Sequence, residues 1–201
     1  MTKLLHISAS PRGEKSKSRA LALAHIESRV AKDPTLQVDT IDLWDEVLPQ
    51  FDGDWAAAKM ALFGEGEMTD EMQANWTHLT EITNRFIAAD HYVFNVPMWN
   101  SGVPYRLKQY IDIITQPGFL YGFAPETGYY GLLSGKTATV IVSSAVWAPG
   151  VDARFGRDFH SGYLEWWLHK IGVKDAKFIR YQPSMLTADP AAQFEAARAQ
   201  L

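Results

Sequence analysis

His91-Tyr92-Val93-Phe94-Asn95-Val96-Pro97-Met98-Trp99-Asn100-Ser101 is the stretch that decides the fold. Its first six residues, 91–96, are almost wholly apolar, which is typical of a strand buried on both faces of a parallel sheet. Pro97 ends that strand, because proline has no N–H to donate to a sheet ladder. The residues that follow are then expected in a loop at the carboxyl end of a buried strand.

Short apolar runs and helical patterns alternate on both sides of this strand. The runs predict strands at residues 3–9, 37–43, 91–96, 137–142 and 176–181. Helical spacing and start signals predict helices at about 18–30, 69–88, 105–115 and 159–171, with a last one after Asp189-Pro190. Residues 44–68 are irregular around a possible helix at 55–63, and so long a connection is usually a lid or an interface piece.

This alternation predicts an α/β fold with a parallel sheet and helices on both faces, because right-handed crossovers permit little else. Five strands suit the order 2-1-3-4-5. The chain has 201 residues without a repeat or a linker-like segment, so we expect a single domain over 1–201. In such a sheet, ligands bind beyond the carboxyl ends of the strands where the winding reverses, here between strands one and three.

Composition and charge exclude several classes of function. The net charge is −4 and no long basic run is present, so we expect no nucleic-acid partner. The chain has no cysteine and no histidine pair at metal-binding spacing, which argues against thiolate chemistry and a metal and fits a cytoplasmic protein. The apolar start at residues 1–7 is too short for a signal peptide or a membrane span, so no membrane association is expected.

The loop after strand one, 10–18, places hydroxyls and free N–H groups at a helix N-terminus, an arrangement that holds a phosphate. Ser16 and Ser18 are the predicted direct contacts. The loop is not a P-loop, since Lys15-Ser16 lacks the preceding glycine, and no GxGxxG follows the strand. The alternative is that the serines only cap the helix.

The loops after strands three and four complete the predicted site. In the first, Trp99 and Asn100 offer a stacking surface and directional hydrogen bonds to a flat heteroaromatic ring, although a core tryptophan and a turn asparagine would look the same. In the second, Ser143-Ser144-Ala145-Val146-Trp147 could supply hydroxyl and backbone donors to the polar edge of that ring. As a motif this second loop is weak, because serine after a strand is commonly turn chemistry.

The chain resembles the FMN-dependent NADH-azoreductase and quinone oxidoreductase family, whose members are flavodoxin-like homodimers with a three-layer sandwich. The resemblance rests on Ser10 with Ser16-Lys17-Ser18, on Pro97 to Ser101 with Pro104, Leu107-Lys108 and Asp112, and on Gly131-Leu132 with Gly135-Lys136. It implies that Ser10, Ser16, Lys17 and Ser18 bind the FMN phosphate. It also implies that Pro97, Met98, Trp99, Asn100 and Ser101 line the isoalloxazine ring, and that Ser143, Ser144, Ala145 and Val146 reach its pyrimidine end.

Two positions depart from the family pattern. Ala145-Val146 stands where relatives commonly carry Gly-Gly, and valine resists backbone conformations that glycine permits. Trp99 stands where relatives often carry tyrosine, which keeps an aromatic face and loses a hydroxyl. The loop after strand four is therefore expected to approach the flavin differently.

The resemblance implies an enzyme that passes electrons from NADH or NADPH to a quinone or azo compound by ping-pong kinetics. The chemistry would occur at flavin N5, so no catalytic side chain is expected. Phe119, Tyr121, Phe123 and Trp147 are predicted to wall the substrate pocket together with a lid at Phe51 to Phe63, partly from the second subunit in a relative; plain core or interface packing is the alternative. Six histidines are present, and one near the flavin could give a proton to a reduced quinone.

Two other functions fit the same fold. One is a flavodoxin-type FMN electron carrier, against which the mild charge and the long segment 44–68 argue. The other is a binding protein that has lost its cofactor, since fold does not determine function.

Overall fold

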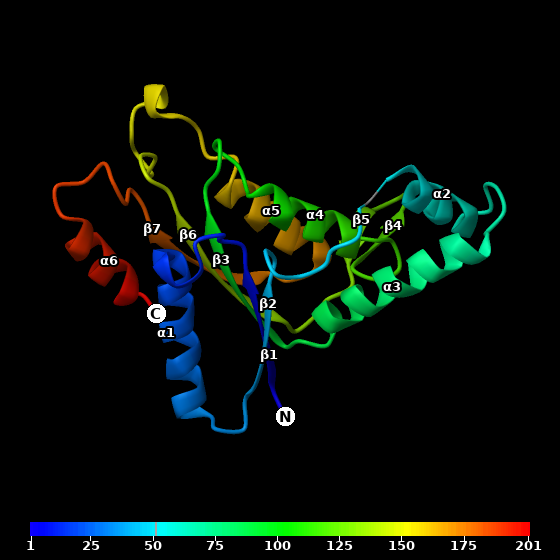
Figure 1. Cartoon of the computed structure of the whole chain (residues 1–201), viewed down its shortest axis with the longest axis horizontal. Helices are drawn as coiled ribbons and strands as arrows, with labels where there is room; N and C mark the ends of the chain where they lie inside the picture. Colours follow the sequence, from blue (N-terminus) through cyan, green and yellow to red (C-terminus); the bar gives the residue numbers. More distant parts are fainter. Residues whose placement is uncertain (51) are drawn as a thin grey trace.

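The computed structural model describes residues 1–50 and 52–201, and its centre is a five-stranded parallel sheet. The order β2-β1-β3-β6-β7 is the 2-1-3-4-5 order predicted from the sequence, and the flavodoxin-like fold is confirmed (Figure 1). Neighbouring strands pair in parallel throughout this sheet. The strands are β1 (Lys3–Ser8), β2 (Gln37–Asp42), β3 (His91–Pro97), β6 (Thr137–Ser143) and β7 (Asp175–Tyr181).

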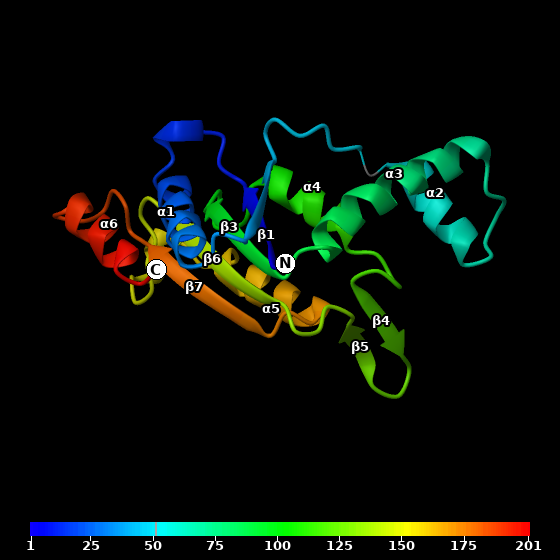
Figure 2. The same ribbon diagram turned by 90° about the horizontal axis from the view of Figure 1, so that it is seen from below.

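Helices cover both faces of the sheet, which gives three layers (Figures 1 and 2). On one face lie α1 (Lys17–Lys32) and α6 (Pro190–Arg198); on the other lie α3 (Asp70–Ile87), α4 (Tyr105–Ile114) and α5 (Ser161–Ile171). The helix α2 (Gly53–Leu62) packs on α3, at one end of the molecule. Two short 3-10 turns, η1 (Gly13–Lys15) and η2 (Ala153–Phe155), lie in loops.

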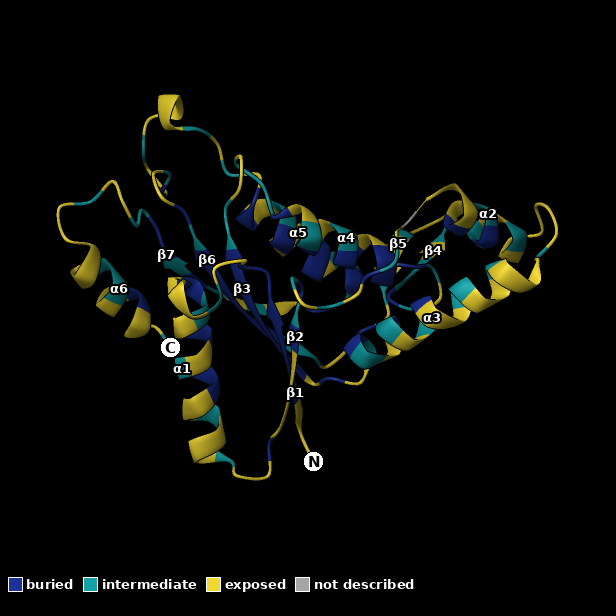
Figure 3. Cartoon of the chain, in the orientation of Figure 1, coloured by how far each residue is buried: buried dark blue, intermediate teal, exposed yellow. Residues whose placement is uncertain are grey.

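Successive residues of the central strands point to opposite faces and so divide the core in two. Leu4 and Val93 pack with Leu21 of α1, whereas Leu5 and Phe94 pack in the larger core under α3, α4 and α5. Both cores lie against the same sheet, in which the central strands β1, β3 and β6 are mostly buried and the edge strand β2 is mostly exposed (Figure 3).

The predicted helix starts are confirmed by their caps. Thr69 accepts a hydrogen bond from the N–H of Met72 (3.2 Å) and begins α3. Asp189 accepts from Ala191 and Ala192 (3.0 and 2.9 Å) and begins α6, with Pro190 in its first turn. A side-chain oxygen at this position satisfies N–H groups that have no partner inside the helix.

The aromatic segment after α4 forms a two-stranded antiparallel hairpin that the sequence did not predict. Its strands are β4 (Tyr121–Ala124) and β5 (Gly128–Gly131). Gly131 lies directly on the end of α5: a Cβ added there would come within 2.1 Å of the backbone nitrogen of Gly172. The N–H of Leu133 also donates to the carbonyl of Ile171 (3.0 Å). The hairpin is therefore held by backbone contacts that require a glycine.

Replacing Gly131 by alanine is expected to lower the free energy of unfolding by about 1–3 kcal/mol, because the added methyl group forces the hairpin away from α5. Urea unfolding followed by tryptophan fluorescence measures this. Gly162→Ala is the matched control, since a Cβ at Gly162 of α5 meets nothing within 4 Å. Equal stability of the two variants would contradict the expectation.

Two histidines, His25 and His91, form a buried polar cluster between α1 and the sheet. The Oγ1 of Thr139 lies 3.3 Å from Nε2 of His25 and 3.2 Å from Nε2 of His91, whose Nδ1 is 2.5 Å from Oγ1 of Thr137. Burial, and then the nearby Arg29 and His25, lower the pKa of His91 to about 4. The folded protein therefore holds this ring neutral at pH 7.

Since the pKa of His91 is about 4 in the folded state and 6.5 when unperturbed, the unfolded chain binds the extra proton more readily between these values. The free energy of unfolding is expected to fall by about 2 kcal/mol as the pH drops from 6.5 to 4. Urea titrations across this range measure the slope. His91→Gln should be less stable at pH 7, but its free energy of unfolding should change less with pH. If the change with pH were the same as in the unaltered protein, another group would be responsible for the acid sensitivity.

Candidate functional site

The loops after β1, β3 and β6 meet at the carboxyl edge of the sheet around a small cavity of about 70 Å³, which we call the serine cavity. Ser16 lies in the connection after β1, and Pro97 and Ser143 are the last residues of β3 and β6; all three line the cavity. The full lining is Ser10, Arg12, Ser16, Lys17, Ser18, Pro97, Ser143, Tyr181 and Ser184. Six of these were predicted as site residues from the sequence; Arg12, Tyr181 and Ser184 were not.

The start of α1 makes the serine cavity receptive to an anion. Ser16 is the N-cap of α1, as the capping alternative supposes: its Oγ accepts from the N–H of Arg19 (3.3 Å) and lies 3.2 Å from Oγ of Ser18. A helix N-terminus carries partial positive charge, and Arg12 and Lys17 add full charges. Among the described residues that line the cavity, none is acidic.

The loop after β6 is held by its neighbours on both sides. The N–H of Met98 donates to the carbonyl of Ser143 (2.7 Å), and the N–H of Ser184 donates to that of Ser144 (2.8 Å). The carbonyl of Ala145 accepts from Met185 and Leu186 (2.9 and 3.0 Å). Neither Ala145 nor Val146 has a positive φ. The loop thus takes a backbone path that alanine and valine permit.

The loop after β3 makes a tight turn that presents Trp99. The N–H of Trp99 donates to the carbonyl of Gly102 (2.9 Å), and the carbonyl of Trp99 accepts from the N–H of Gly102 (2.8 Å). Both central residues have positive φ, 47° at Asn100 and 66° at Ser101. Asparagine tolerates this conformation, whereas serine in it costs about 1–3 kcal/mol. The surrounding contacts therefore hold a strained backbone at this point of the site.

An aromatic cluster supports this turn and was missed in the sequence. Trp44 packs against both Trp99 and Tyr105, with ring centroids 5.6 and 5.4 Å apart. Its Nε1 donates to the carbonyl of Ala9 (3.1 Å). One side chain beyond β2 thus ties the loop after β1 to the loop after β3.

Beside the turn lies a second hollow of about 520 Å³, the aromatic pocket. This volume is within the range of small-molecule sites, about 300–1,000 Å³. Pro97 lines the serine cavity and Trp99 lines the aromatic pocket, so one loop joins a site for an anion to a site for a flat ring. The pocket is lined by Trp99, Asn100, Gly102, Val103, Tyr105, Lys108, Phe159 and Tyr163.

The wall of the aromatic pocket differs from the predicted one. Phe119 packs on Trp76 (6.3 Å between centroids), and Tyr121 and Phe123 pack on Tyr129 of the hairpin, at the far end of α5 (Figure 2). One chain therefore does not bring these predicted wall residues to Trp99, and the positions that line the pocket instead are Tyr105, Phe159 and Tyr163.

Two further parts of the predicted wall lie outside the aromatic pocket. Trp147 lies in the loop after β6, where its carbonyl accepts from the hydroxyl of Ser144. Of the predicted lid, Phe51 is outside the described residues, and Trp55 is buried in α2 against the core.

His160 lies at the start of α5 and is fully buried. Its ring lies close to the backbone of Val96, an interaction that works against the effect of burial on its pKa. Burial lowers the pKa of His160 to about 4, with Asp158 opposing the shift. The ring is therefore held neutral at pH 7.

The backbone around His160 connects α5 to the turn. The N–H of Phe159 donates to the carbonyl of Ser101 (2.9 Å), and Asp158 accepts from the N–H groups of His160 and Ser161 (2.9 and 2.7 Å). Arg180 of β7 lies 3.7 Å from Asp158. The start of α5 is thus fixed to both β7 and the turn.

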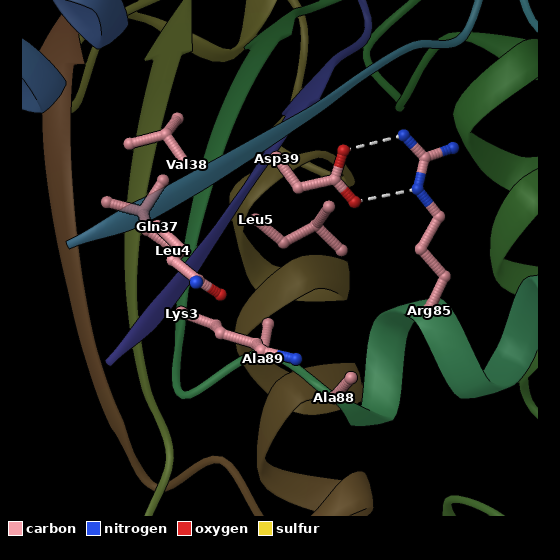
Figure 4. A pocket seen from close by; sticks show the side chains of 9 residues that line it. All are labelled: Lys3, Leu4, Leu5, Gln37, Val38, Asp39, Arg85, Ala88 and Ala89. Carbon is pink, nitrogen blue, oxygen red and sulfur yellow. Dashed lines mark hydrogen bonds and ion pairs between the residues drawn. The ribbon is translucent and has the colours of Figure 1, made fainter. Parts of the chain in front are cut away.

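A further hollow of about 360 Å³ lies at the amino ends of β1 and β2, away from the strand ends that carry the site. Figure 4 shows its polar feature, the two-pronged ion pair of Arg85 with Asp39 (2.8 Å for each contact). These two charges satisfy each other, and the hollow lies away from the edge of the sheet where the serine cavity is found.

Residues 1–50 and 52–201 contain no cluster of histidine, aspartate and glutamate that could hold a metal, and no helix among them is long and apolar enough to cross a membrane.

Comparison with known proteins places this geometry in context. The family with a flavodoxin-like fold matches residues 2–201. An FMN-dependent NADH:quinone oxidoreductase of Ruegeria pomeroyi is 60% identical over 201 residues, covering 100% of this chain and 98% of that protein. A protein of the same name from Desulfotalea psychrophila is 40% identical over 185 residues, covering 92% and 87%.

Among solved structures, an FMN-dependent NADH-azoreductase of Bacillus anthracis in complex with FMN is similar to this chain. It superposes with a TM-score of 0.88 at 27% identity, covering 100% of this chain and 95% of that one. The likeness extends over the whole length in both sequence and fold, and the chain belongs to the flavodoxin-like family that includes the FMN-dependent NADH:quinone oxidoreductases.

Proposed function

We propose that this chain is an FMN-dependent oxidoreductase that passes electrons from NADH or NADPH to quinones or azo compounds in two half-reactions. The observation that carries the proposal is the serine cavity joined to the aromatic pocket by residues 97–101. The relatives named above support the same cofactor and donor. A pocket of about 520 Å³ beside the ring site favours planar small-molecule substrates over a carrier that meets only proteins.

The residues of the serine cavity fit the phosphate of FMN. Hydroxyls of Ser10, Ser16 and Ser18 line it together with two cations at the N-terminus of α1, which is the chemistry that holds a phosphate. Its 70 Å³ is about twice the ~30 Å³ that one water takes in the liquid, so the space suits a compact anion and excludes a ring.

The neighbouring loops fit the flavin ring. We propose that Met98, Trp99, Asn100 and Ser101 lie along the ring and that residues 143–146 face its pyrimidine end. The backbone N–H groups of Ala145 and Val146 have no hydrogen-bond partner among the described residues, so they are free to donate there. When bound, FMN would accept hydride at N5, and donors at this edge would stabilise the negative charge of the reduced ring.

The assembly we propose is a homodimer of single-domain chains. Both cores lie on one sheet, so residues 1–201 form one FMN-binding domain. Phe123 and Tyr129 are exposed on the hairpin, at the other end of α5 from the aromatic pocket. They can wall that pocket only if a second copy supplies them. We place the enzyme in the cytoplasm, where NADH is available as donor.

The purified protein is expected to carry the yellow absorption of FMN, or to regain it on reconstitution, and to oxidise NADH with menadione or an azo dye. Double-reciprocal plots at several acceptor concentrations should be parallel, as two half-reactions at a shared site require. A yellow protein without NADH oxidation would indicate the electron carrier. A protein that does not take up FMN would contradict the proposal.

Ser18→Ala is expected to weaken FMN binding about tenfold and leave riboflavin binding unchanged, because a lost hydrogen bond to a charged group costs about 1.5 kcal/mol or more and riboflavin has no phosphate. Quenching of flavin fluorescence on titration into the apoprotein measures both affinities. Ser28→Ala, an exposed position further along α1, is the matched control. Equal losses for FMN and riboflavin would place Ser18 away from the phosphate.

A further inference from the structure

A third hollow, the lysine groove, lies between α2, α4 and α5 and has a volume of about 480 Å³. Lys59 of α2, Lys108 of α4 and Lys170 of α5 line it, so three helices each bring one cation to the same space. Its aromatic wall comes from α5 and consists of Tyr163, Trp166 and Trp167. Lysines beside aromatic faces are suited to a flat ring that carries negative charge.

The positive charge of the groove is only partly neutralised. Lys108 pairs with Asp112 (2.7 Å), whereas Lys59 and Lys170 have no ion pair among the described residues. Burial, and then the charge of Lys170, lower the pKa of Lys59. The groove thus holds two unpaired cations close enough to repel each other, which an anion would relieve.

The ammonium group of Lys170 is held in place by aromatic rings. It lies 4.4 and 4.7 Å from the ring centroids of Tyr121 and Tyr129 and 5.3 Å from that of Trp166. Such cation–π contacts orient the ammonium without neutralising it. Its charge therefore remains available to a ligand.

The lining also holds a buried acceptor that lacks a partner. Gln116 is 1% exposed, and its Nε2 donates to the carbonyls of Asp112 and Ile113 (2.8 and 3.2 Å). Its Oε1 has no hydrogen-bond partner among the described residues, although Gln116 lines the groove. A buried oxygen without a partner costs about 1–3 kcal/mol, so this atom is suited to a donor such as an amino group.

The groove continues the aromatic pocket. Lys108 and Tyr163 line both hollows. Along this path, Tyr105 at the start of α4 lines the aromatic pocket, and Gln116 just beyond its end lines the groove. At 1.5 Å per residue these positions are about 16 Å apart, so the two hollows together suit an elongated ligand.

We propose that the lysine groove binds a nucleoside diphosphate, namely the adenosine diphosphate half of the nicotinamide dinucleotide. The diphosphate would lie at Lys59, Lys108 and Lys170, and the base at Trp166, in the part of the groove that Gln116 also lines. The inference rests on the proposed function, because it places the nicotinamide half in the aromatic pocket. A sulfonated quinone shares the chemistry of a ring with an anion, so the test includes one.

Calorimetry on the purified holoenzyme with ADP, adenosine and anthraquinone-2-sulfonate tests binding without turnover. ADP is expected to bind more tightly than adenosine, and Lys59→Ala to weaken ADP about tenfold, with Lys59→Glu weaker still. Lys32→Ala, on α1 across the sheet, is the matched control and should bind ADP as the unaltered protein does. Binding of the sulfonate without ADP would assign the groove to an anionic acceptor and overturn the proposal.

Steady-state kinetics test whether Lys59 acts on the binding of NADH. Reduced nicotinamide mononucleotide lacks the adenylate, so Lys59→Ala should raise the ratio of the KM for NADH to the KM for the mononucleotide about tenfold. If Lys59→Ala still reduced menadione with an unchanged ratio of the two KM values and bound ADP as the unaltered protein does, this inference would be overturned and the proposed function would stand. If the protein carried no FMN and showed no turnover but still bound ADP, the proposed function would be overturned and the assignment of the groove to ADP would stand. A changed molecular mass of Lys59→Glu in light scattering, with no loss of ADP binding, would make the groove a contact between copies and overturn it as well.

Discussion

The pairing of β1, β3 and β6 is the constraint on which the rest of this molecule depends. Parallel hydrogen bonding sets Ser8 opposite Asn95 and Pro97 opposite Ser143, so the three strands finish at the same edge of the sheet. The chain must then leave that edge three times within a small space. The serine cavity, the strained turn and the loop after β6 are the three ways in which it does so.

Much of the fold could be predicted because its signals are local. Buried runs such as 91–96 and caps such as Thr69 depend on residues that are adjacent in sequence, and the strand order follows from the crossovers they permit. The hairpin could not be predicted, since β4 and β5 have four residues each and none of their side chains is fully buried. Its position depends on the fit of Gly131 to the end of α5, which is a contact between distant parts of the chain.

The candidate site likewise contains residues that could be predicted from the sequence and residues that could not. Ser143 is the last residue of β6, and Ser16 and Ser18 lie at the start of the helix that follows β1, so their meeting is a consequence of the topology. Ser184 reaches the cavity from beyond β7, and Trp44 reaches the turn from beyond β2; no local pattern marks either. The aromatic content of 119–123 is visible in the sequence, but its distance from Trp99 depends on the length and direction of α5. Residue type was therefore easier to predict than location.

Helix α5 is fastened at both ends to parts of the protein with different roles. At its start, Phe159 bonds the turn at Ser101 and Asp158 approaches Arg180; at its end, Gly131 and Leu133 press against Ile171 and Gly172. The rise per residue of an α-helix is fixed, so the length of Ser161–Ile171 sets the distance between its two ends. The separation of the hairpin from the turn at Ser101 is consequently set by the number of residues in this single helix.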